Sequence, residues 1–207
     1  MRILFVAALV AFLAACTAKT DDAPPVIVPK GPGEQAQTLA PEDVGTDRWV
    51  APNEADLTYV VSMIEHHKQA LEMSALAPER AQNETVKALA SRIYDTQGPE
   101  IGGMEQWQRQ YGEKAPAHGH SGKMPDVDHG SMPGMATAEQ MNALKNARGA
   151  DFDRMFLQLM IAHHEGALKM AVDLLKAGVD PRVQEMANDV LVSQQDEINT
   201  MKSITIS

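Results

Sequence analysis

Cysteine, aromatic residues and positive charge are all scarce in this chain of 207 residues. A single cysteine excludes a disulfide within the chain, and if its thiol is blocked the soft metal ligands that remain are methionine and histidine. The net charge of −10 argues against nucleic acid and anionic membrane surfaces as partners. Methionine is plentiful by contrast, with 13 residues against 4 phenylalanines and 2 tryptophans. That balance is unusual for a hydrophobic core.

The N-terminus has the pattern of a secretory signal. Arg2 precedes an apolar run over residues 3–13, and Ala14-Ala15-Cys16 follows it. The run is too short to span a bilayer as a stable helix. Because bacterial lipoproteins place a cysteine directly after the cleavage site, we predict that residues 1–15 are a signal peptide and that Cys16 is lipidated. Thr17 after the cysteine favours the outer membrane.

Residues 16–52 show little hydrophobic periodicity and carry six prolines, at positions 24, 25, 29, 32, 41 and 52. This composition predicts a disordered tether. The lipid would be the protein's sole membrane attachment, and the folded part would lie on the periplasmic side of the bacterial envelope.

An eleven-residue sequence occurs twice, 97 residues apart. Residues 63–73 read MIEHHKQALEM and residues 160–170 read MIAHHEGALKM. The same offset gives 14 identities between residues 56–107 and 153–204 without a gap. Repeats of this length are typically duplicated supersecondary units, and no segment of any length has a strand period. We predict an all-α fold made of two homologous helical hairpins, residues 53–113 and 138–207, joined by a linker over residues 114–137.

Capping residues and breakers place the helices within each hairpin. The predicted helices begin near Asn53, Glu84, Thr137, Asp151 and Asp180-Pro181. We expect a kink or break near Gly98-Pro99, a break at Arg148-Gly149, and a stop at Gly178.

The repeated motif puts histidines and methionines on the face that a helix normally buries. At 100° per residue, the two histidines, the two methionines and the alanine of the motif fall within a 120° arc. Burying adjacent histidines in both copies costs polar desolvation twice without an obvious structural return, which favours metal binding. The candidate ligands are Met63, His66, His67, Met73, Met160, His163, His164 and Met170.

The second helix of each hairpin carries a matching inward pattern. Glu100 and Met104 recur as Glu197 and Met201, each pair preceded by a glutamine at Gln97 or Gln194. The glutamates either bind the metal directly or hydrogen-bond the histidines and fix their orientation. The methionines are additional candidate ligands.

Thioether and imidazole without thiolate favour copper, Cu(I) over Cu(II), with silver as its mimic. The linker has the same composition, which predicts metal binding there too. Its candidate ligands are His118, His120, Met124, His129, Met132 and Met135.

The doubled motif Met-Ile-x-His-His-x-x-Ala-Leu-x-Met resembles a bacterial family known as domain of unknown function 305, which includes CopM-like periplasmic copper-binding proteins. The likeness covers residues 53–113 and 150–204, including Trp107 and Tyr111-Gly112. It implies a ferritin-like four-helix bundle with one long crossover, and copper binding through the inward methionines and histidines of the motif. The linker tract is not part of the shared motif.

We therefore expect a lipid-anchored envelope protein that sequesters copper or hands it to copper-handling partner proteins, without catalysis. One alternative is a ferritin-like di-iron or di-manganese oxidase, although its Glu-x-x-His signature is missing from both motif helices. The other alternative is a methionine-rich helical module that binds another protein.

Overall fold

The computed structural model describes residues 26–28, 35, 37–39, 51–114 and 124–206. The chain divides into two compact units, Met1–Trp49 and Val50–Ser207. The predicted signal peptide, Cys16, His118 and His120 lie outside the described residues.

The first unit contains a small antiparallel ladder. Strand β1 (Val26–Val28) pairs with β2 (Gln37–Leu39), with Ile27 opposite Thr38. The sequence predicts a tether without strands in this region, and the paired strands differ from that expectation. The β-branched run Val-Ile-Val explains the difference, because such residues fit an extended, pleated backbone.

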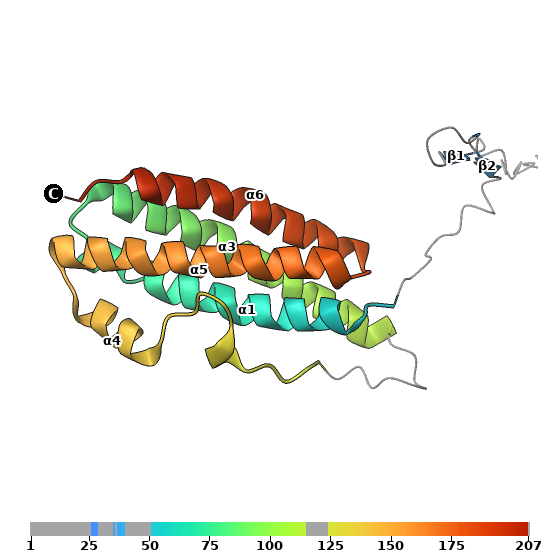
Figure 1. Ribbon diagram of the computed structural model, residues 1–207, viewed down its shortest axis with the longest axis horizontal. Coiled ribbons are helices and arrows are strands. Elements are labelled where there is room, and N and C mark those ends of the chain that lie inside the picture. Colours follow the sequence, from blue (N-terminus) through green and yellow to red (C-terminus); the bar gives the residue numbers. More distant parts are fainter. Residues whose placement is uncertain (1–25, 29–34, 36, 40–50, 115–123, 207) are drawn as a thin grey trace, which may run out of the picture. The chain divides into compact units, whose positions relative to one another are not determined.

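The second unit is a four-helix bundle, which confirms the all-α prediction (Figure 1). Helices α1 (Glu54–Ser74) and α3 (Glu84–Lys114) form one hairpin, with the single turn α2 (Ala77–Arg80) at its bend. Helices α5 (Gly149–Ala177) and α6 (Pro181–Ser203) form the other. The described part of the linker holds the 3₁₀ turn η1 (His129–Ser131) and leads along α1 into α4 (Ala138–Asn146). No described helix is long and apolar enough to cross a membrane.

The predicted helix starts are confirmed. Asn53 and Thr137 each form a reciprocal capping box, and Asp180 accepts the backbone N–H groups of Arg182 and Val183 before a helix that begins at Pro181. The break at Arg148-Gly149 is confirmed as well, since α4 ends at Asn146 and α5 begins at Gly149.

We expected a kink or break near Gly98-Pro99, and a break there is wrong, because α3 continues through Pro99. Buried side chains on both sides of the proline, Ile93 and Ile101, pack into the core and hold the helix together. Gly178 does end α5, but with φ −71° rather than in the left-handed conformation. A Cβ at Gly178 would overlap Asp56 and Leu174, so close packing requires the glycine.

Two buried aspartates at the same repeat position tie the hairpins to each other. Asp56 of α1 accepts the N–H groups of Val179 and Asp180, ahead of α6. Asp153 of α5 accepts those of Gln82 and Asn83, ahead of α3. Each hairpin thus caps the second helix of the other, and α1 and α5 run antiparallel.

The apolar core consists of two clusters rather than one. The first joins the end of α1 to the start of α5 and includes Met73, Phe152 and Met160. The second joins the start of α1 to the end of α5 and includes Met63, Met104 and Ala171. Between them, at mid-helix, lies a layer of buried polar side chains.

Candidate metal centre

The polar layer contains the four histidines of the repeated motif. His66 and His67 of α1 and His163 and His164 of α5 are all 0% exposed. Gln97 on α3 and Gln194 on α6 are also buried, and each is 2% exposed. The predicted inward orientation of the histidines is therefore confirmed. The duplication places one motif on each of the two helices through which the hairpins meet.

The two hairpins contact each other through histidine rings. The ring centroids of His66 and His163 lie 3.7 Å apart, with 35° between the ring planes. These residues occupy the same position in the two repeats, so the contact is made across the pseudo-twofold relation of the hairpins. The sequence could not show this pairing, since it depends on how α1 packs against α5.

The second histidine of each motif is bound to a glutamate of its own hairpin. His67 Nε2 lies 2.8 Å from Glu100 Oε2, and His164 Nε2 lies 2.7 Å from Glu197 Oε2. A carboxylate accepts, so the hydrogen of each ring is on Nε2 and its Nδ1 is left free. A carboxylate bonded to the histidine in this way is the arrangement by which glutamates orient metal-binding imidazoles.

His66 is oriented by the linker instead of a glutamate. Its Nε2 donates to the backbone oxygen of Pro133 at 3.0 Å. A carbonyl can only accept, so a neutral His66 also carries its hydrogen on Nε2 and presents the Nδ1 lone pair. Three of the four imidazoles are therefore held with Nε2–H bonded outward and Nδ1 unused.

The layer is rich in buried polar atoms without a partner. Among them are Nδ1 of all four histidines, Nε2 of His163, and both amide atoms of Gln97 and Gln194. Leaving one such atom buried and unpaired costs about 1 to 3 kcal/mol. Native cores hold few of them, so their concentration makes this layer the candidate binding site.

The paired rings are neutral at physiological pH. Burial lowers the pKa of His66 from 6.5 to about 4, and the neighbouring His67 and His164 act in the same direction against the Pro133 hydrogen bond. Burial also holds the pKa of His163 well below 6.5, with His66 the largest of the smaller causes. Neutral imidazole is the form that binds a metal ion.

Residues 132–136 of the linker, here called the strap, cross α5 directly over this layer. A Cβ at Gly166 would overlap the Pro133 carbonyl, and one at Gly134, with φ +79°, would overlap the Ala162 carbonyl. Gln69 fixes the other side, because its amide donates to Ala136 O at 2.9 Å and accepts from Ala136 N at 2.7 Å. Gln69 and Gly166 occupy equivalent repeat positions. The two copies diverge there because the strap binds one and passes over the other.

The predicted methionines do not gather at the histidines as one set. Met63 and Met104 belong to one apolar cluster, and Met73, Met160 and Met201 to the other. Met170 is half-buried and lines a surface pocket. In the linker, Met132 is buried and Met124 and Met135 are half-buried, so the described part of the tract packs on the bundle. His129 lies in η1.

Within the described residues, no three histidine, cysteine, aspartate or glutamate side chains converge into a ready-made ion site. The arrangement instead offers paired neutral imidazoles between two methionine-containing clusters. Soft ions that accept thioether and imidazole are the ones this donor set suits.

The fold and site together define a class of protein: a duplicated helical hairpin whose two copies meet through histidines from an HisHis motif. The chain belongs to the DUF305 family, described as a domain of unknown function, which matches residues 56–205.

Solved structures of similar proteins share this fold. A DUF305 fragment from Deinococcus radiodurans is 31% identical, with a TM-score of 0.63 over 74% of this chain and 96% of that one. CopM in its Cu(I)-bound form is 29% identical, with a TM-score of 0.57 over 71% of this chain and 92% of CopM. CopM also has Cu(II)-bound and Ag-bound structures.

One curated relative is viral. Uncharacterized protein L153 of Acanthamoeba polyphaga mimivirus is 42% identical over 52 residues. The match spans 25% of this chain and 34% of L153.

Proposed function

We propose that this protein binds copper ions in the histidine layer and sequesters them or hands them on, without catalysing a reaction. The observation that carries the proposal is the set of buried, oriented imidazoles with unused Nδ1 atoms. Metal-binding histidines characteristically donate their other ring N–H to a carboxylate or a backbone carbonyl. His67, His164 and His66 each follow that pattern.

We propose Cu(I) as the main ion, and Cu(II) and silver as further ions that the site can bind. The donors available in and around the layer are imidazole and thioether, and thioether selects soft ions. The Cu(I), Cu(II) and Ag forms of the similar protein CopM support the same choice.

We further propose that Cys16 carries a lipid and that residues 16–52 tether the bundle to the periplasmic side of the envelope, with the outer membrane favoured. Copper-handling proteins would be the partners there. Intact-mass analysis of the protein purified from membranes tests the anchor, since a processed but unmodified N-terminus would overturn it.

The di-iron or di-manganese oxidase is less well supported. That class uses four glutamates with two histidines. Among the described residues, Glu100 and Glu197 are the glutamates that contact the motif histidines, and Glu100 keeps 32% of its side chain exposed.

The test is to load the protein with Cu(I) under reducing conditions and record copper content and X-ray absorption. We expect nitrogen and sulfur around the bound copper. Replacing His66 and His163 with leucine should weaken binding at least about tenfold, the loss typical of disturbing a metal site. Iron or manganese retained with oxygen ligands, after copper washes off, would replace this proposal with the enzyme.

A matched control separates the bundle from the linker tract. The triple variant His118→Gln, His120→Gln, His129→Gln removes the linker histidines and leaves the buried layer intact. We expect it to retain the tightest copper. If the triple variant loses that copper and the core variant keeps it, the histidine layer is not the site.

A further inference from the structure

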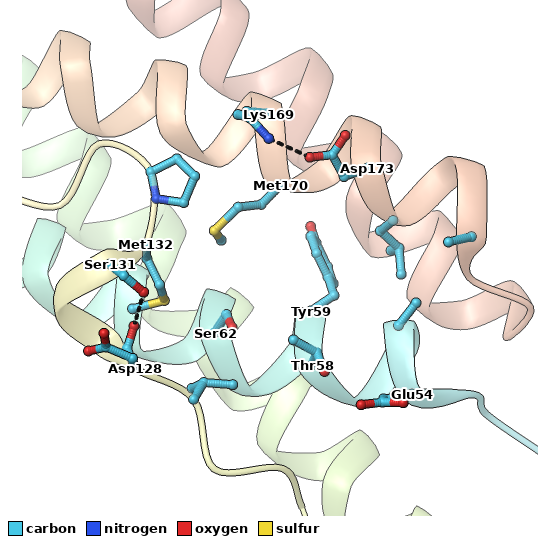
Figure 2. Close-up of a pocket in the computed structure, with 15 residues that line it drawn as sticks. Glu54, Thr58, Tyr59, Ser62, Asp128, Ser131, Met132, Lys169, Met170 and Asp173 are labelled. Atoms are coloured by element: carbon cyan, nitrogen blue, oxygen red, sulfur yellow. Dashed lines mark hydrogen bonds and ion pairs between the residues drawn. The ribbon is translucent and has the colours of Figure 1, made fainter.

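A surface pocket of about 710 Å³ lies beside the histidine layer, between α1, the linker and α5. Two thioether side chains enter it from different walls, Met132 from the strap and Met170 from α5 (Figure 2). Met132 is 9% exposed and Met170 is half-buried, so neither is simply a solvent-facing side chain.

The pocket also contains a polar group that lacks a partner. Tyr59 is 5% exposed, and its hydroxyl makes no hydrogen bond to any described residue. Figure 2 shows the ring rising from α1 with its hydroxyl directed into the pocket. Burial, with Glu100 and Asp189 as smaller causes, raises the pKa of Tyr59, so the phenol stays protonated at the pocket wall.

The rim of the pocket carries negative charge. Glu54, Asp128 and Asp173 line it together with Lys169. Asp173 is already paired with two lysines, Lys169 at 2.6 Å and Lys176 at 3.4 Å, so Glu54 and Asp128 supply the remaining negative charge. Charges of one sign around a concave surface raise the local concentration of the opposite ion. The rim therefore favours a cation over an anion.

Pro133 connects the pocket to the histidine layer. It lines the pocket, and its backbone oxygen accepts the hydrogen bond from His66 Nε2. One residue of the strap therefore belongs to both places. An ion bound to Met132 would therefore sit at the residue next to Pro133, whose carbonyl orients His66.

We propose that Met132 and Met170 form a second, solvent-accessible site for a soft monovalent cation, Cu(I) or Ag(I), through which ions load the histidine layer. This inference rests on the proposed copper binding. The two thioethers bind the ion, and a water or other exchangeable ligand completes its coordination. Thioether donors exclude hard cations, so the pocket also selects by softness before an ion reaches the imidazoles.

The test uses the full chain with Cys16→Ala, which removes the competing thiol, and methionines labelled with ¹³C at the methyl group. Ag(I), which is diamagnetic, is added in substoichiometric steps. We expect the Met132 and Met170 methyl resonances to shift together and first, ahead of those of Met155 and Met186, which do not line the pocket. Zn(II) should shift the methyl resonances of neither pair. If the Met132 and Met170 methyls do not move, or move no more than the control pair, the pocket site is overturned.

Loading is then measured as the rate of Cu(I) transfer from a colorimetric chelator. Met132→Leu with Met170→Leu keeps the side-chain volumes similar and should slow loading about tenfold or more, while the final copper content of the histidine layer changes little. The control variant, Met155→Leu with Met186→Leu, should load at the wild-type rate. Equal rates for both double variants would overturn the loading role.

The background variant His66→Leu with His163→Leu distinguishes the two proposals. If the pocket methyls still respond to Ag(I) there, the pocket binds the ion independently of the layer. A pocket response that disappears with the histidines would mean that the thioethers are not a separate site. Histidine resonances that never respond in the wild-type chain would contradict the proposed function instead, and would leave the pocket result standing.

Discussion

His163 differs from the other three histidines because neither of its ring nitrogens makes a hydrogen bond within the part of the chain that the structure describes. His66 is held by Pro133, while His67 and His164 are held by glutamates. Holding an unpaired imidazole in the core costs stability that a hydrocarbon of similar size would not cost. Sites that a protein keeps at such a cost are typically functional.

His163→Leu should therefore stabilise the metal-free protein, raising the free energy of unfolding by about 1 to 2 kcal/mol. The comparison variant is His164→Leu, which leaves the buried Glu197 carboxylate with Arg92 at 3.7 Å as its remaining partner. It should lower the free energy of unfolding by about 2 to 3 kcal/mol. Urea denaturation of the metal-free proteins measures both. Destabilisation by His163→Leu would mean that the imidazole is a structural part of the core.

The low pKa of His66 makes the stability of the metal-free protein depend on pH. Between about pH 6.5 and pH 4, the unfolded chain binds a proton at this histidine and the folded chain does not. The free energy of unfolding therefore falls as the pH is lowered through that window. The shift from 6.5 to about 4 corresponds to a loss of about 3 kcal/mol at most. Urea denaturation from pH 7 to pH 4 checks this. His66→Leu should make the curve less steep, and part of the remaining slope comes from His163, whose pKa burial also holds well below 6.5. A wild-type curve already flat below pH 6.5 would contradict the neutral, buried ring.

Among the elements, the strap is the one whose position depends on a difference between the repeats. Gly166 allows residues 132–136 to lie against α5, and Gln69 binds Ala136 from α1. The strap in turn supplies the carbonyl that orients His66. A single methyl group on α5 can therefore disturb the histidine layer through the linker.

Gly166→Ala should displace the strap and destabilise the protein by about 1 to 3 kcal/mol, as overpacking does. Hydrogen exchange at residues 132–136 should become faster. The control is Gly102→Ala in α3, where no atom lies within 4 Å of an added Cβ. That change should stabilise the helix by about 0.5 to 1 kcal/mol. If both variants behave alike, the strap does not press on α5.

For the whole molecule, the reciprocal caps of Asp56 and Asp153 hold the hairpins in register. Each carboxylate is buried and accepts backbone N–H groups from the opposite hairpin. Their regions lie at opposite ends of the bundle (Figure 1). The register that they fix is also what brings His66 against His163.

Asp56→Ala and Asp153→Ala should each lower the free energy of unfolding by about 2 to 3 kcal/mol, because buried N–H groups lose their acceptor. Their effects should add to within about 0.5 kcal/mol, since the sites are far apart. Asp151→Ala is the control, because this aspartate has an 80% exposed side chain and pairs with Arg154 on its own helix. Thermal denaturation of the two single variants, the double variant Asp56→Ala with Asp153→Ala, and Asp151→Ala measures these changes in stability. Strong coupling between the two caps would show that they do not act at independent ends.

Much of the fold could be predicted from the sequence because local sequence patterns determine it. The 97-residue repeat, the helical spacing of the motif and the caps at Asn53, Thr137 and Asp180 predicted two hairpins and their helix starts. A break at Pro99 was wrong, because the packing of Ile93 and Ile101 overrides the low helix propensity of proline. The repeat shows that aspartate occupies the same position in both copies, as Asp56 and Asp153. Their hydrogen bonds to the opposite hairpin have no signal in the local sequence.

The sequence by itself determined that four histidines turn inward, because the period of a helix decides which residues share a face. It could not determine their partners. That His66 meets His163, that Glu100 and Glu197 hydrogen-bond His67 and His164, and that the strap reaches His66 all depend on packing between segments far apart in the chain. The methionines show the same division: their burial follows from spacing, whereas their separation into two clusters and a pocket follows from how α1 crosses α5 and where the linker returns. Helical period is a property of a few neighbouring residues, and coordination geometry is a property of the assembled core.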